Sequence, residues 1–152
     1  MSLKQWADNG WLHSHTTSEE EIRNLLGMVE RNLKDASENI SADWKFSIAY
    51  NAALTLCNVL LCSEGYRAAR EAHHYRVIQS VQLILGSEHR ADVEYLEACR
   101  RKRNIIEYEV PGAATEENAR ELIDFVVHFK SIAMDWLSKK HPQLLKTFRT
   151  EG

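Results

Sequence analysis

Four consecutive basic residues, Arg100 to Arg103, lie in the stretch CRRKRNIIEYE at residues 99–109. A guanidinium suits planar anions such as phosphate, because it offers five N–H donors in a rigid fork. Asn104 and Tyr108 are four residues apart, so a helix would place them as a polar pair next to Arg103, with Arg101 on the same side. These four residues are the first candidates for a ligand-binding site.

Arg103 occupies a position where a helix in a bundle would place an apolar side chain. The apolar residues of that face recur every three or four positions, as Leu96, Cys99, Ile106 and Val110. An unpaired charge there would cost several kcal/mol, so Arg103 needs a carboxylate, a water-filled cleft, a ligand or a subunit interface. Pairing with Glu107, one turn later, or a stem that packs while the head reaches water would be a purely structural solution. An anion site would be the functional one.

The adjacent histidines His73 and His74 are further ligand-binding candidates, because one of them could move a proton near Arg103. Neighbouring residues on a helix point about 100° apart, so only one is expected to face such a site. Their other interpretation is that they begin a helix or face solvent. No HxxxH or HxxE pair offers two metal ligands on one helix face, and His13 and His15 near the N-terminus are worse placed. We therefore expect no metal and no cofactor.

The three cysteines, Cys57, Cys62 and Cys99, are an odd number, and each lies inside an apolar helical pattern. The CxxxxC spacing of the first two is not a usual zinc or redox motif. We expect all three to be buried, reduced thiols that pack as small hydrophobic groups.

The elements that must hold these residues are predicted to be helices. Ser18 can cap a helix that runs to about residue 36, and Ser41 one that runs to Ser63. Further helices are expected at 73–85, at 90–109 and from Thr115 to just before Pro142. No strand-like alternation is evident. The pattern predicts an all-α, up-and-down bundle of about five helices in a single domain spanning residues 1–152.

The 41–63 segment carries two apolar stripes where most surface helices carry one, which predicts a helix at the centre of the bundle. The preceding segment, residues 1–17, contains Trp6 and Trp11 around Gly10. We expect this segment to pack across the bundle, and a patch that binds a partner is the alternative.

The composition is that of a folded protein, with 44% hydrophobic and 27% charged residues. The net charge is −3, but residues 66–103 carry eight basic and five acidic side chains. An acidic chain binds nucleic acid poorly without specificity, so any anionic ligand should be held by this middle part. No apolar run approaches the ~18 residues of a membrane span, and MSLKQWADNG does not resemble a signal peptide. A cytoplasmic protein without membrane contact is expected.

The motif Arg103-Asn104-x-x-x-Tyr108 on a late helix resembles the signature of the HEPN family (higher eukaryotes and prokaryotes nucleotide-binding). That signature is an Arg, often followed by a polar residue, and then a His after four to six intervening residues. The run DWKFSIAYNAAL, with GYR at 65–67 and HH at 73–74, is similar to an uncharacterised bacterial branch of the family. The resemblance covers roughly residues 18–140.

The resemblance implies a helical bundle that forms a homodimer with the motif helices facing each other. It also implies metal-independent RNA cleavage in active members, several of which are toxins paired with a nucleotidyltransferase antitoxin. In such members the motif Arg stabilises phosphate charge, a role that transfers to Arg103. Tyr108 stands at the His position, and a phenol with a pKa near ~10 is a weak general base.

The sequence therefore leaves three hypotheses. The first is a HEPN-like domain, non-catalytic or weakly active, that binds a nucleotide, RNA or a protein partner as a dimer. The second is a ribonuclease toxin in which Tyr108 and a histidine elsewhere share the chemistry. The third is a structural or adaptor bundle in which Arg103 pairs only with a carboxylate.

Overall fold

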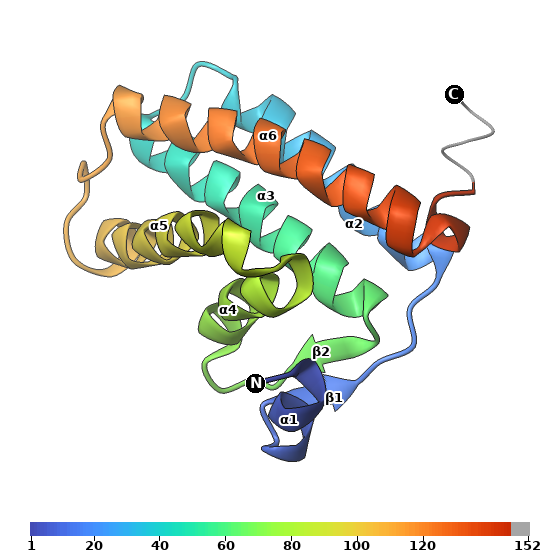
Figure 1. The fold of residues 1–152 in the computed structure, drawn as a ribbon. Helices are drawn as coiled ribbons and strands as arrows, with labels where there is room; N and C mark the ends of the chain where they lie inside the picture. The colour runs from blue at the N-terminus through green and yellow to red at the C-terminus, as the bar shows by residue number, and fades with distance from the viewer. Residues whose placement is uncertain (147–152) are drawn as a thin grey trace.

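The computed structural model describes residues 1–146 and is helical apart from two short strands (Figure 1). Its α-helices are α1 (Leu3–Asp8), α2 (Glu19–Ala36), α3 (Ala42–Ser63), α4 (His73–Leu85), α5 (Arg90–Tyr108) and α6 (Glu116–Lys140). Two 3-10 helices, η1 (Ser87–His89) and η2 (Pro142–Leu145), and the strands β1 (Leu12–Ser14) and β2 (Tyr66–Ala68) complete this part of the chain. The prediction of an all-α bundle is confirmed, and the five predicted helices correspond to α2 through α6.

Side-chain caps fix where the long helices begin. The hydroxyls of Ser18, Ser41 and Thr115 each accept a hydrogen bond from the backbone N–H three residues later, which satisfies a donor that the first turn would leave unpaired. Gly86 ends α4 with a φ of 105°, a conformation that disfavours residues with a Cβ. α5 ends at Tyr108, shortly before Pro111.

Helix α3 is the centre of the bundle and contacts α2, α4, α5 and α6. In Figure 1 it runs between α6 and α2 on one side and α4 and α5 on the other. Its residues Ala53, Leu56 and Leu60 have no exposed surface, as expected for one of the two apolar stripes. Helix α3 is long and apolar enough to span a membrane, although no single apolar run in the sequence indicated this. However, 78% of its most apolar 18-residue segment is buried inside the fold. It is the core helix.

The N-terminal segment packs onto the α3–α4 end of the bundle through a small sheet. β1 pairs with β2 in antiparallel register, so the expectation that the chain has no strand was wrong. Trp6 is only 7% exposed and meets Trp11 edge to face, with ring centroids 5.8 Å apart. The Arg76 guanidinium of α4 lies 3.6 Å from the centroid of Trp11. These contacts attach residues 1–15 to the fold.

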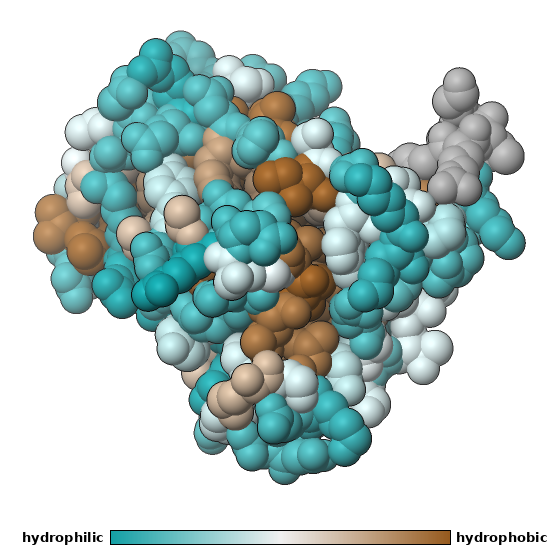
Figure 2. Space-filling view, in the orientation of Figure 1, coloured by the Kyte–Doolittle hydropathy of each residue, from teal (hydrophilic) through white to brown (hydrophobic). Residues whose placement is uncertain are grey.

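The buried apolar residues form one contiguous core, and the surface over it is mainly hydrophilic. Figure 2 shows an exception on the face shared with Figure 1, an apolar strip between α6 and the region of η1. Cys57, Cys62 and Cys99 are all buried and free, as expected. Burial raises the pKa of each thiol, to about 11 for Cys62 and for Cys99, so all three remain protonated at neutral pH.

Candidate anion-binding cleft

A surface cleft of about 640 Å³ lies between the beginning of α4 and the C-terminal half of α5. Its lining residues are Arg70, Ala72, His73, His74, Tyr75, Arg100, Arg103, Asn104 and Tyr108. Five of the six ligand-binding candidates from the sequence are therefore in one place. They come from two segments about thirty residues apart in the chain, and the packing of α4 against α5 brings them together.

Arg103 lies in the wall of this cleft, with its side chain 19% exposed. Its Nε atom is 3.0 Å from Oε1 of Glu107, so the two form an ion pair within α5. The angle does not suit a hydrogen bond, and this buried Nε has no hydrogen-bond partner among residues 1–146. The guanidinium also lies 5.5 Å from the centroid of the Tyr50 ring. Arg103 is thus held on one side and retains unused donor capacity.

Arg100, one turn before Asn104, adds a second guanidinium that the sequence analysis did not select. Its Nε donates to both carboxylate oxygens of Glu97, at 3.1 and 3.0 Å. Glu97 is only 8% exposed, so Arg100 neutralises a buried carboxylate. The hydrogen bonds to Glu97 raise the pKa of Arg100. Arg100 therefore serves the fold as well as the cleft.

Arg101 was predicted to be a ligand-binding residue, on the same side of the helix as Asn104 and Tyr108, but it does not line the cleft. Its side chain is 72% exposed and extends back toward Glu97, with Nε 3.7 Å from the carboxylate. It lines a separate depression with Gln79 and Gln82 of α4. Helix spacing fixes the direction of its Cβ, and the attraction of Glu97 turns the guanidinium away from the cleft.

Both histidines line the cleft, although only one was expected to face it. Their rings are 5.9 Å apart and inclined by 61°, so the cleft curves around the start of α4. The preceding residue, Ala72, has a left-handed φ of 53°, which bends the chain into the helix at some cost in strain. The sequence could not show that both histidines line the cleft, because their directions depend on the arrangement of the loop before α4.

Both imidazoles are neutral at physiological pH. Burial, assisted by Arg67, holds the pKa of His73 below its ordinary value. Burial also lowers the pKa of His74, with smaller contributions from Arg103, His73 and Arg100. Nδ1 of His74 is 3.2 Å from the hydroxyl of Tyr50. Burial raises the pKa of Tyr50, so this phenol keeps its proton and is available to donate it to Nδ1. In that arrangement Nε2 of His74 carries the imidazole proton and is a donor.

Besides Ala72, the cleft contains two more residues that the sequence did not single out, Arg70 and Tyr75. Arg70 lies in the loop before α4, and Tyr75 is 40% exposed with the Arg100 guanidinium 5.9 Å from its ring centroid. The +3 balance of residues 66–103 was the only available signal for them. This charge balance identified the basic region of the chain, but it could not identify which side chains of that region lie together in the cleft.

The comparisons with known proteins assign no family to this chain. No family model, no curated protein and no solved structure matches it.

Proposed function

We propose that this protein is a HEPN-like helical domain that binds the phosphate group of a nucleotide or an RNA in the α4–α5 cleft. The observation that carries the proposal is the convergence of three guanidinium groups, from Arg70, Arg100 and Arg103, on one open cleft. The ion pairs of Arg100 and Arg103 with glutamates position the side chains. Since the Glu107 contact of Arg103 involves Nε, an anion can approach the terminal nitrogens of the fork.

The other lining groups also suit a nucleotide. The amide of Asn104 and the donor on His74 can bond phosphate or sugar oxygens, and neutral histidines leave the positive charge to the arginines. Tyr108 is 77% exposed at the rim of the cleft, where its ring can stack on a base. Stacking of this kind is worth about 1–3 kcal/mol per base and tolerates any sequence.

Binding is better supported than catalysis. A general base must be able to accept a proton, and the Tyr50 hydrogen bond occupies Nδ1 of His74 and favours the tautomer in which Nε2 already holds a proton. A ribonuclease is the second candidate function, because His73 shares the cleft with Arg103 and stays neutral. In that case a nucleotidyltransferase antitoxin is the partner that the family resemblance suggests.

The decisive experiment is fluorescence anisotropy with a labelled single-stranded RNA, competed by ATP, on wild type, Arg103→Ala and Arg101→Ala. The two variants remove the same charge from the same helix, and only Arg103 lies in the cleft. We expect Arg103→Ala to weaken binding at least ~10-fold, as loss of a charged hydrogen bond implies, and Arg101→Ala to change it less than ~3-fold. Equal effects would show that binding depends on net charge alone.

The same samples test for ribonuclease activity by gel electrophoresis of the RNA. We expect intact RNA with the wild-type protein. Cleavage that is lost in His73→Gln and kept in Arg101→Ala would establish the second candidate function instead. If the wild type binds neither RNA nor ATP detectably, the remaining hypothesis is that the protein is a structural or adaptor bundle.

A further inference from the structure

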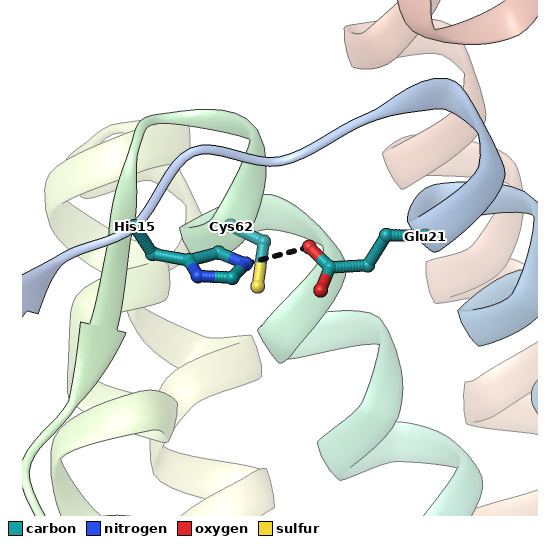
Figure 3. A group of neighbouring side chains, drawn as sticks. All are labelled: His15, Glu21 and Cys62. Atoms are coloured by element: carbon teal, nitrogen blue, oxygen red, sulfur yellow. Dashed lines mark hydrogen bonds and ion pairs between the residues drawn. The ribbon is translucent and has the colours of Figure 1, made fainter.

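Three potential metal ligands from three different elements meet at the end of α3 farther from the cleft (Figure 3). His15 follows β1, Glu21 lies in the first turn of α2, and Cys62 lies in the last turn of α3. One ligand atom from each lies within 4.8 Å of the other two. The three residues of this cluster are not among those that line the cleft, so the two are different sites.

The fold holds these side chains in place before any metal arrives. The backbone N–H of His15 donates to the carbonyl of Gly65 at 2.9 Å, which fixes the end of β1 against the chain leaving α3. Ser18 caps α2 and so fixes the turn that carries Glu21. The hydroxyl of Thr17 donates to Oε1 of Glu21 at 2.6 Å, a contact of the kind that orients metal-binding carboxylates.

We propose that His15, Glu21 and Cys62 form a zinc site. An imidazole nitrogen, a carboxylate oxygen and a thiolate sulfur are the three ligand types that Zn²⁺ prefers, and three protein ligands leave a fourth position for water. Nε2 of His15 and Oε1 of Glu21 are now hydrogen-bonded at 2.7 Å. Ligands of one tetrahedral zinc ion lie roughly 3.5 Å apart, given bonds of about 2.0–2.3 Å, so small side-chain rotations would admit the ion.

The surroundings of the three ligands let an ion enter from solvent. They also include a positive charge that opposes a bound cation. His15 and Glu21 are 19% and 38% exposed, so an ion can enter from solvent, and Cys62 closes the buried side. Cys62 lies in the last turn of α3, at the negative end of the helix dipole, which favours a cation. Arg67 of β2 acts against it, because its charge reaches both Glu21 and Cys62. Its side chain is exposed and can turn to solvent.

A Cys-His-Glu nucleophilic triad is the other chemistry that this cluster could suggest, and the structure opposes it. Cys62 is only 7% exposed, and in the absence of a metal ion its thiol keeps its proton, because burial raises its pKa to about 11, whereas a bound metal ion displaces that proton. A substrate could not reach the sulfur, whereas an ion needs far less room.

No metal was expected from the sequence, because no single helix face carries two of the usual ligands in an HxxxH or HxxE spacing. The donors here lie on a strand end, a helix start and a helix end, and their positions in the sequence follow no motif. Only the pairing of β1 with β2 and the packing of α2 on α3 bring them together.

Titration of the full-length protein with Co²⁺, followed by Zn²⁺ displacement, tests the site. Co²⁺ bound through a thiolate gives a sulfur-to-metal charge-transfer band, and we expect one band saturating at one equivalent. Cys62→Ala should abolish the band, and His15→Gln or Glu21→Gln should weaken binding at least ~10-fold. Arg67→Ala should tighten it. Cys99→Ala, which removes another buried thiol, and His13→Gln, which alters the exposed histidine of β1, should leave it unchanged.

Two results would overturn the zinc site. One is the absence of a charge-transfer band in the wild type, and the other is a band that Cys62→Ala retains or that Cys99→Ala loses equally. If Cys62→Ala does not fold, the Glu21→Gln variant tests the site instead, because Glu21 is partly exposed. In that case the Zn²⁺-induced rise in melting temperature of the wild type must be lost in Glu21→Gln and kept in His13→Gln, or the proposal is wrong.

Discussion

Arg103 shows how a charged residue can occupy an apolar helix position without a fully buried charge. Its stem continues the face formed by Leu96, Cys99 and Ile106, which are all under 9% exposed. Its head reaches the wall of the cleft, where the Glu107 carboxylate and the Tyr50 ring contact it. The two interpretations drawn from the sequence are therefore compatible, because the same residue pairs within α5 and faces a site for an anion.

The two cleft arginines should differ in their effect on stability. Arg103→Ala removes an ion pair with a 33% exposed Glu107 and a weak ring contact, so we expect a loss of about 1–2 kcal/mol. Arg100→Ala leaves the buried Glu97, among residues 1–146, with the looser ion pair to the exposed Arg101 at 3.7 Å, and should cost about 3 kcal/mol. Urea denaturation measures both. A larger loss for Arg103→Ala than for Arg100→Ala would mean that Arg103 is the main structural arginine.

His74 should make stability depend on pH below neutrality. Its pKa in the folded state is lower than the value of about 6.5 expected when unfolded, so the unfolded chain takes up a proton first as the pH falls. The free energy of unfolding should therefore decrease from pH 7.5 to pH 5. His74→Gln, which can still accept the Tyr50 hydrogen bond, should show a smaller decrease. His13→Gln, at an exposed position, should behave as wild type, and an identical pH profile for His74→Gln would contradict the assignment.

At the residue level, the sequence indicated which side chains are unusual for their positions. It was less reliable in predicting which of these side chains lie together in the fold. Asn104 and Tyr108 share a helix face, which spacing alone defines, whereas Arg103 points about 100° away from Asn104 and joins the cleft because α4 packs beside α5. Arg70 and Tyr75 could not be selected, because their places depend on the loop before α4 and on the left-handed Ala72. Arg101 was misplaced because helix geometry fixes the Cβ direction and leaves the guanidinium free to follow Glu97.

At the level of elements, prediction succeeded where the ends carry local signals. The capping hydroxyls of Ser18, Ser41 and Thr115, together with Gly86 and Pro111, defined the long helices to within a residue or two. The strands β1 and β2 are three residues each, too short for an alternating pattern. They form because each pairs with the other, more than fifty residues away, and no local propensity encodes that contact.

Helix α3 should be the last element to exchange its amide hydrogens. It is buried against four other helices, so opening it requires disrupting most of the core, whereas the shorter α1 contacts mainly β1. We expect the slowest exchange in the central turns around Ala53–Leu60, with protection close to the global free energy of unfolding. Mass spectrometry of peptides from the native protein gives the measurement. Exchange in α3 as fast as in α1 would contradict its central role.

At the scale of the whole molecule, several exposed apolar side chains lie where α3 begins and α5 ends. Trp44 is 66% exposed, Ile105 38% and Tyr108 77%. Val110 was predicted to face inward, and that prediction was wrong, because α5 ends at Tyr108 and leaves it 52% exposed. A depression lined by Trp44 and Ile106 joins the two helix ends. Covering these side chains in a subunit interface would remove apolar surface from water.

We therefore expect a homodimer in which the α5 ends of two copies lie close together. Such a dimer would place Tyr108, and with it the rim of each cleft, near the other copy, so that one RNA could contact both. Trp44→Glu should shift the protein to a monomer in light scattering at tens of micromolar, because it places a charge in the interface. The matched change Val127→Glu alters a side chain that is 56% exposed on α6 and should leave the dimer intact. A wild-type monomer at that concentration would rule out the dimer. If Val127→Glu alone dissociates it, the interface lies on α6, and the two clefts need not be near each other.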